Sequence, residues 1–206
     1  MPADDRGRPR GTDGYGENAE VLVARYESLS FLDNHADILH LLPAAPARVV
    51  DIGAGSGRDA AGFARLGHEV VAVEPTAEMR SRGEELHRDV AITWLDDCLP
   101  DLAGLRPMGP FDVVAMTAVW MHLDAAEREA AMAVIGNLVA PGGLLVLSLR
   151  HGPVPPGRHM FAVTGDETVA LAARHGFEQV FRAQVPSKLS QPGVSWTKLA
   201  FRKRRG

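Results

Sequence analysis

Apolar residues along this chain fall into two patterns that alternate from about residue 48 onward. Short continuous runs, such as residues 70–73, lack polar alternation, which is typical of parallel strands buried on both faces. Between these runs the apolar residues recur every three or four positions, which predicts helices. The repeated strand–helix order predicts an α/β fold with a doubly wound, seven-stranded, mostly parallel sheet and helices on both faces.

The boundaries of these elements follow from the same pattern and from stop signals. Strands are expected over 49–52, 69–74, 90–95, 111–117, 144–149, 177–184 and 194–202, and helices over 56–66, 76–86, 124–139 and 168–175. Thr76 is a candidate N-cap, Gly67 a candidate helix stop, and Asp124 with Glu127 has the spacing of a capping box. Residues 17–46 carry two helical patterns but are too few to bury a core, so we expect a helical cap on a single domain spanning 17–206.

Composition indicates where this domain is located and which partners it can bind. Residues 1–16 are polar and rich in Gly, Arg and Asp, which predicts a disordered tail and not a signal peptide. The single cysteine, Cys98, excludes an internal disulfide and favours a reducing, cytoplasmic location. No apolar run reaches the roughly 18 residues that span a membrane. The net charge of −4 gives no general attraction to nucleic acid. We therefore expect a small-molecule partner and a monomer or homodimer.

A glycine turn follows the first predicted strand. Gly53, Gly55 and Gly57 allow a tight turn and close approach of a ligand, and the next helix directs its free N–H groups at that turn. A dinucleotide fold prefers G-x-G-x-x-G, but here Arg58 replaces the third glycine. Asp51, just before the turn, would repel a pyrophosphate. The turn therefore predicts a nucleotide-like ligand that carries an ammonium group, and it disfavours NAD.

At this point the chain resembles the class I S-adenosylmethionine-dependent methyltransferases. The resemblance covers roughly residues 48–149 and rests on VDIGAGSG at 50–57, VAVE at 71–74, the acid after the third strand, and PGG at 141–143. It implies a Rossmann-like sheet whose antiparallel last strand inserts between the two before it. It also implies S-adenosyl-L-methionine as cofactor and S-adenosyl-L-homocysteine as product.

The resemblance assigns roles to the acids around the turn. Glu74 would accept the ribose hydroxyls, and Asp51 would lie near the methionyl end. Asp96 or Asp97 would accept the adenine amino group; we favour Asp96, the first acid after the strand, but the doublet leaves both open. Arg58 either pairs with the ligand carboxylate or lies on the helix surface. The expected cofactor-binding residues are Asp51, Gly53, Ala54, Gly55, Arg58, Glu74, Pro75, Asp96, Asp97, Met116, Thr117 and Trp120.

The segment after the fourth strand argues against several methyltransferase subclasses. Residues 117–120 read TAVW, without the prolines of enzymes that methylate exocyclic nucleobase amines and without the cysteine nucleophile of cytosine C5 methylases. Arg150 and His151 follow the fifth strand, where a metal-dependent catechol-type enzyme needs an acid, and the histidines lack zinc-site spacing. We therefore expect metal-free, in-line methyl transfer to a small molecule.

Acceptor recognition is expected from the cap and from the loops after the fourth and fifth strands. His122 is a candidate general base, although a histidine in such a position more often has a packed or hydrogen-bonding role. The basic loop over 150–159 either binds a carboxylate or phosphate or is a solvated surface loop. The candidate substrate-binding residues are Tyr15, Tyr26, Arg150, His151 and Arg158. Two alternatives remain: a non-catalytic nucleotide-binding or regulatory module on the same fold, and an NAD(P)-dependent oxidoreductase.

Overall fold

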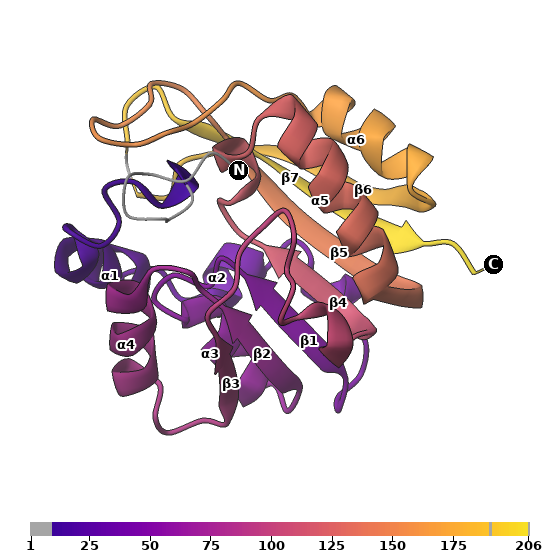
Figure 1. Ribbon diagram of the computed structural model, residues 1–206, viewed down its shortest axis with the longest axis horizontal. Helices are drawn as coiled ribbons and strands as arrows, with labels where there is room; N and C mark the ends of the chain where they lie inside the picture. The colour runs from indigo at the N-terminus through magenta and orange to yellow at the C-terminus, as the bar shows by residue number, and fades with distance from the viewer. Residues whose placement is uncertain (1–9, 190, 206) are drawn as a thin grey trace.

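The computed structural model describes residues 10–189 and 191–205 of the chain. Seven strands form one sheet in the order β3-β2-β1-β4-β5-β7-β6 (Figure 1). Their bounds are β1 Arg48–Ile52, β2 Glu69–Val73, β3 Ile92–Leu95, β4 Phe111–Met116, β5 Val139–His151, β6 Phe177–Pro186 and β7 Ser195–Lys203. The first five strands pair in parallel, and β7 is antiparallel to both β5 and β6. The predicted insertion of an antiparallel last strand is therefore confirmed.

Helices cover both faces of this sheet (Figure 1). The α-helices are α1 Ala19–Glu27, α2 Phe31–His35, α3 Arg58–Arg65, α4 Ala77–Leu86, α5 Ala125–Leu138 and α6 Gly165–Arg174, with 3₁₀ turns η1 Arg10–Thr12, η2 Leu39–Leu41, η3 Arg106–Met108 and η4 Trp120–His122. One apolar core packs under α5 and α6, and a second packs under α2 and α3. Neighbouring strand residues point into different cores: Val49 belongs to the second and Val50 to the first. This double burial is why the strands read as continuous apolar runs.

Local signals account for most element ends. Asp124 and Glu127 form the complete capping box of α5, and Gly67 follows α3 with φ +90°. Thr76 occupies the N-cap position of α4, but its side chain makes no capping bond. The Glu74 carboxylate instead accepts the Thr76 N–H at 2.8 Å. The strand β5 begins directly at the end of α5, so the predicted turn over 141–143 lies inside the strand.

The structure differs from the predicted disordered tail over the part of the tail that it describes. Residues 1–9 lie outside the described residues, whereas residues 10–16 form η1 and a following turn. Tyr15 packs beside Tyr26 of α1, and its hydroxyl contacts His122 at 3.0 Å. The ordered chain thus includes a segment that reaches the carboxyl edge of the sheet.

The helical cap contacts the rest of the domain at two places. Phe31 of α2 packs against Gly62 of α3 so closely that a Cβ on Gly62 would lie 2.1 Å from the Phe31 ring. Lys198 of β7 donates to the Asn34 carbonyl oxygen and pairs with Asp37 at 3.0 Å. These contacts hold α2 and the residues after it against α3 and β7.

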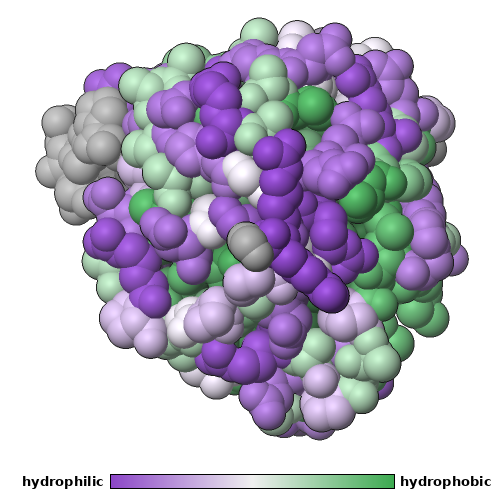
Figure 2. Space-filling model, turned by 90° about the vertical axis from the view of Figure 1, so that its right-hand side faces the viewer, coloured by the Kyte–Doolittle hydropathy of each residue, from purple (hydrophilic) through white to green (hydrophobic). Residues whose placement is uncertain are grey.

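The edge of the sheet that lies opposite the carboxyl ends of the parallel strands is where β7 ends. Figure 2 shows a mostly hydrophilic face there, with apolar side chains in small groups. Arg202 belongs to β7 and donates to the Leu41 carbonyl oxygen. Arg204 and Arg205 are exposed. Within the described ranges no helix has both the length and the apolar character needed to cross a bilayer.

Candidate cofactor and acceptor site

A cavity of about 240 Å³ opens at the carboxyl ends of β1, β2 and β4. In this sheet β1 lies between β2 and β4, so the chain leaves β1 toward one side and later returns on the other. Ligands of doubly wound folds bind in the crevice formed at such a switch point. The cap helices α1 and α2 and the segment 11–15 contribute to the wall above this crevice.

The glycine turn brings backbone, not side chains, to the cavity. Gly53 has φ +72°, and a Cβ there would lie 2.5 Å from Val119. Gly57 has φ +83°, and a Cβ there would lie 2.6 Å from the Trp94 ring. Both positions therefore require glycine for conformation and for space. The helix α3 starts at the end of this turn and directs its first N–H groups toward it.

Glu74 sits at the end of β2 beside this turn. Its Oε2 accepts the Gly55 N–H at 2.9 Å and its Oε1 accepts the Thr76 N–H at 2.8 Å. The residue is only 6% exposed, and burial raises the pKa of its carboxyl despite these two bonds. Each oxygen keeps a further lone pair, so the group is an acceptor for hydroxyl donors in the cavity.

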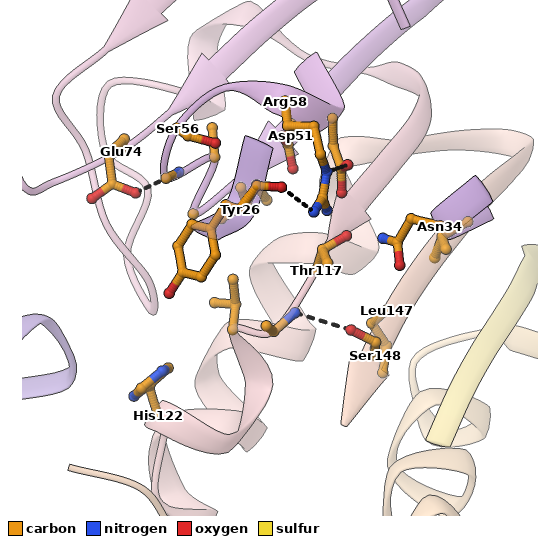
Figure 3. A pocket seen from close by; sticks show the side chains of 18 of the residues that line it. Tyr26, Asn34, Asp51, Ser56, Arg58, Glu74, Thr117, His122, Leu147 and Ser148 are labelled. Atoms are coloured by element: carbon orange, nitrogen blue, oxygen red, sulfur yellow. Dashed lines mark hydrogen bonds and ion pairs between the residues drawn. The ribbon is translucent and has the colours of Figure 1, made fainter. Parts of the chain in front are cut away.

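Asp51 and Arg58 form the charged end of the cavity (Figure 3). The Oδ2 of Asp51 is buried without a hydrogen-bond partner among the described residues. Burial, reinforced by the nearby Asp59 carboxylate, raises the pKa of Asp51 well above its ordinary value. A cation placed beside Asp51 would relieve this desolvation, because it favours the charged form.

Arg58 is held inside the site and does not lie on the helix surface. Its Nε donates to Asp59 Oδ1 at 2.7 Å, and one terminal nitrogen donates to the Tyr26 carbonyl at 3.2 Å. Burial disfavours the cation, but the Asp59 carboxylate outweighs it and raises the pKa of Arg58. Asp59 also pairs with His35 of α2 at 2.9 Å. This buried cluster joins the cap to the glycine turn.

The two acids after β3 have different surroundings. Asp97 lines the cavity, and its carboxylate accepts the N–H groups of Cys98, Gly104 and Leu105. Asp96 points outward, is 66% exposed in its side chain and pairs with Arg80 at 2.8 Å. The preference for Asp96 is therefore wrong on geometry: the strand end turns Asp96 to solvent and Asp97 to the cavity.

Two further predicted cofactor residues do not line the cavity. Met116 and Trp120 are fully buried in the core beneath α5. Met116 follows the alternation of β4 and shares the core-facing side with Val114. Trp120 belongs to η4, which turns its ring into the same core. The predicted cofactor residues that do line the cavity are Asp51, Gly53, Ala54, Gly55, Arg58, Glu74, Pro75, Asp97 and Thr117.

Sequence reasoning missed a polar contact at the end of β4. Ala118 has φ +62°, an uncommon conformation for a residue with a side chain. Its N–H donates to the Ser148 hydroxyl at 3.0 Å (Figure 3). Ser148 and Asn34 both line the cavity. Ser148 is a polar residue within the otherwise apolar stretch of β5, and that interruption was the available signal.

His122 and Tyr15 meet at another wall of the cavity. The Tyr15 hydroxyl lies 3.0 Å from His122 Nε2, and His122 Nδ1 lies 2.7 Å from the His159 carbonyl oxygen. Both residues line the cavity, as does Tyr26. Burial lowers the pKa of His122 to about 4, so the imidazole is neutral near pH 7.

The basic loop after β5 does not reach the cavity with its side chains. The Arg158 guanidinium lies over the Tyr15 ring, 3.6 Å from its centroid. Arg150 donates to the Pro153 carbonyl at 2.8 Å, and His151 contacts the Thr197 hydroxyl at 2.7 Å. These three side chains therefore have partners within the chain, and a role for them in acceptor binding stays a prediction. In the described part of the chain, no three potential metal ligands come together; the metal-free mechanism stays a prediction.

Comparison with known proteins identifies the family. A model described as "Methyltransferase domain" matches residues 24–182. An uncharacterized methyltransferase of Geobacillus kaustophilus is 30% identical over 139 residues, which is 68% of this chain and 60% of that protein. A ubiquinone biosynthesis O-methyltransferase of Xanthomonas euvesicatoria is 32% identical over 131 residues, 63% of this chain and 53% of that protein. The chain thus spans a little over half the length of these relatives.

A solved structure shares the fold. The 1,6-didemethyltoxoflavin-N1-methyltransferase of Burkholderia thailandensis, crystallised with its substrate and S-adenosylhomocysteine, aligns with a TM-score of 0.70 at 23% identity. The alignment covers 91% of this chain and 89% of that one. At this identity the likeness shows the fold, and the family model supplies the membership. This chain belongs to the methyltransferase-domain family.

Proposed function

We propose that this protein transfers a methyl group from S-adenosyl-L-methionine to a small-molecule acceptor by in-line displacement and without a metal. One observation carries the proposal: the unpartnered, buried Oδ2 of Asp51 lies in the same cavity as the acceptor-only carboxylate of Glu74. A ligand that satisfies both must present a cation at one point and hydroxyl donors at another. An amino-acid nucleoside does so, whereas a dinucleotide pyrophosphate would meet Asp51 as a like charge.

The remaining groups fit the same ligand. Arg58 has five N–H donors, of which two are engaged by Asp59 and Tyr26, so it can also bind the ligand carboxylate. Asp97 and Cys98 border the part of the cavity next to β3, where the adenine would lie. S-adenosylhomocysteine is present in the Burkholderia structure and S-adenosylmethionine in a magnesium protoporphyrin IX methyltransferase of Synechocystis with the same fold. Both support this cofactor.

The cofactor, when bound, supplies a methyl carbon already activated by a positive sulfur. The protein then has to bind the two reactants in line and exclude water. The apolar cavity wall around Val119, Leu147 and Trp196 suits a small, largely uncharged acceptor. The Xanthomonas relatives are named for O-methylation in ubiquinone biosynthesis and the Burkholderia neighbour for N-methylation of a small heterocycle, which also supports a small-molecule acceptor.

Calorimetry with S-adenosylhomocysteine tests the proposal. We expect a single site with the full-length protein, and no heat of binding at millimolar ligand would refute the proposal. Family membership and Asp51 together argue against the NAD(P)-dependent alternative, which a fluorescence titration with NADH checks independently. Binding without any methyl transfer would favour the non-catalytic module. A cytoplasmic location and a monomeric or homodimeric state remain predictions from the sequence.

A further inference from the structure

The segment 10–16 is seated on the acceptor side of the cavity. A Cβ on Gly11 would lie 3.1 Å from the Cβ of His122, and a Cβ on Gly14 would lie 2.7 Å from the Gly157 carbonyl oxygen. Close approach at both glycines fixes how the segment crosses η4 and the loop after β5. The result is that Tyr15, from the start of the chain, faces His122 across the cavity wall.

The hydrogen bonds at His122 have only one consistent direction. A backbone carbonyl oxygen can only accept, so His122 Nδ1 must donate to His159. In the neutral imidazole the proton is then on Nδ1, and Nε2 has a free lone pair. Tyr15 must therefore donate its hydroxyl proton to Nε2, 3.0 Å away. The loop that carries His159 is itself anchored, because the Phe161 N–H donates to the Met121 carbonyl at 2.7 Å. The His159 carbonyl is thereby held at Nδ1, and this fixes the tautomer.

This arrangement directs the Tyr15 proton at a base; the Tyr26 hydroxyl also hydrogen-bonds the Tyr15 hydroxyl, so one lone pair of the Tyr15 oxygen remains for an acceptor proton. Resting on the proposed methyl transfer, we infer that Tyr15 takes a proton from the acceptor while passing its own proton to His122, so the acceptor carries an O–H or N–H group. The acceptor oxygen or nitrogen forms its bond to the methyl carbon as the carbon–sulfur bond breaks. The acceptor proton goes to Tyr15 Oη, and the Tyr15 proton goes to His122 Nε2.

The charges around the pair are compatible with this transfer. The groups that face His122 are Tyr15, Arg158, His159 and Arg150, and the cations among them oppose a second positive charge on the imidazole. In the proposed step, however, the positive sulfur becomes a neutral thioether as the imidazolium forms. The net charge of the site is therefore unchanged by the transfer.

Arg158 acts through Tyr15 and is therefore a positioning residue. Its guanidinium covers the Tyr15 ring at 3.6 Å and also donates to the Asp13 carbonyl at 3.4 Å. The cation holds the ring over His122 and favours negative character on the phenol oxygen as its proton leaves. Tyr26 also borders Tyr15, but no histidine nitrogen is within hydrogen-bond distance of its hydroxyl among the described residues. Tyr26→Phe therefore removes the neighbouring hydroxyl while leaving the Tyr15–His122 contact in place.

Two reactions separate proton transfer from methyl transfer. The first is methylation of a broad panel of phenols, enols and N–H heteroaromatics, with tertiary amines and sulfides as acceptors that have no proton to lose. The second is formation of S-adenosylmethionine from S-adenosylhomocysteine and methyl iodide, in which iodide leaves and no proton moves. Both are followed by mass spectrometry, with the uncatalysed rate subtracted. The ratio of the two rates is compared among wild type, Tyr15→Phe, Tyr26→Phe, His122→Gln, Arg158→Lys and Arg158→Met.

We expect the ratio for protic acceptors to fall at least about 100-fold in Tyr15→Phe and His122→Gln, the usual contribution of general base catalysis. It should fall less in Tyr26→Phe than in Tyr15→Phe, because Tyr26→Phe keeps the Tyr15–His122 contact. Arg158→Met should lower the ratio, and Arg158→Lys should recover part of it. An unchanged ratio in Tyr15→Phe, or a wild type that methylates only the aprotic acceptors, would overturn the inference.

A measurement on the wild type alone covers the cases in which a variant does not fold or no acceptor is found. Nitrogen-15 NMR of the histidine rings in the S-adenosylhomocysteine complex should show the His122 proton on Nδ1. The opposite tautomer would overturn the inference. Failure of the proposed function looks different: wild type would neither bind S-adenosylhomocysteine nor exchange methyl iodide, and the inference would fall with it.

Discussion

The substitution Glu74→Gln tests the cofactor site with a change of a single atom type. The glutamate accepts two backbone N–H groups, from Gly55 and Thr76, with one oxygen each. Glutamine keeps the shape but has one oxygen and one amino group, so one of the two N–H groups must face a donor. Because the side chain is only 6% exposed, water cannot replace the lost acceptor.

The loss of stability and affinity can be worked out from the one hydrogen bond that is lost. Losing one hydrogen bond to a charged acceptor and leaving a buried N–H unpaired costs about 1.5–3 kcal/mol of unfolding free energy. For a chain of this size that corresponds to a fall in Tm of about 3–12 °C. The ribose hydroxyls would lose part of the same acceptor, so the Kd for S-adenosylhomocysteine should rise about 5- to 150-fold.

Differential scanning calorimetry measures the first quantity and titration calorimetry the second. Glu69→Gln is the matched control, because Glu69 begins the same strand but is exposed at the far end from the cavity. We expect the control to bind S-adenosylhomocysteine as wild type does. If Glu74→Gln matched that control in both Tm and Kd, the assignment of Glu74 to the ribose and to the glycine turn would be refuted.

Three other changes probe the cap, the end of β4 and the buried histidine. Gly62→Ala places a Cβ 2.1 Å from the Phe31 ring, so overpacking of about 1–3 kcal/mol should lower Tm, and an unchanged Tm would contradict the tight cap contact. Ala118→Gly removes a strained φ of +62°, and urea unfolding should show a change between zero and a gain of about 1 kcal/mol; a loss of stability would mean that the conformation is not strained. Burial lowers the pKa of His122 to about 4, below its unfolded value, so its contribution is present above about pH 6.5 and is lost as pH falls toward 4. Urea midpoints of wild type should therefore fall more steeply between pH 7 and pH 5 than those of His122→Gln, and parallel curves would exclude His122 as the cause.

Local sequence signals predicted the turn and its acid because the chemistry there is local. Gly53 and Gly57 need positive φ, and Asp51 and Glu74 stand at the ends of adjacent parallel strands. Parallel register brings such ends to one edge of the sheet whatever the rest of the chain does. Nine of the predicted cofactor residues accordingly line the cavity, and their contacts with a cofactor stay a prediction.

The errors arose where side-chain direction depends on distant contacts. Asp96 and Asp97 are neighbours, and only the loop that ends at Leu105 decides which of them faces the cavity. Trp120 reads as an aromatic beside the ligand, but the η4 turn rotates it into the core. Met116 is different: the period of two along β4 already pairs it with Val114, so its burial was available from the sequence.

Residues 10–16, the described part of the predicted disordered tail, show the opposite kind of error. Polar, glycine-rich composition predicts disorder because such a segment cannot bury much apolar surface by itself. Tyr15 nevertheless has a partner 107 positions away in the chain, and Arg158 covers its ring. The composition of a segment gives no information on a contact that a distant loop supplies.

The same contact bears on the role of the basic loop. Its cations were expected either to bind a carboxylate or phosphate or to lie on a solvated surface, whereas Arg158 stacks on Tyr15, which lines the cavity. Gly14 allows residues 10–16 to approach the Gly157 carbonyl at backbone distance, and Gly11 allows the same segment to approach His122. Acceptor selectivity would then depend on how the start of the chain docks onto the loop after β5. Substitutions at this contact should change the choice of acceptor more than the affinity for S-adenosylhomocysteine. Asp51 on β1 and Glu74 directly after β2 are not part of the contact between residues 10–16 and the loop after β5.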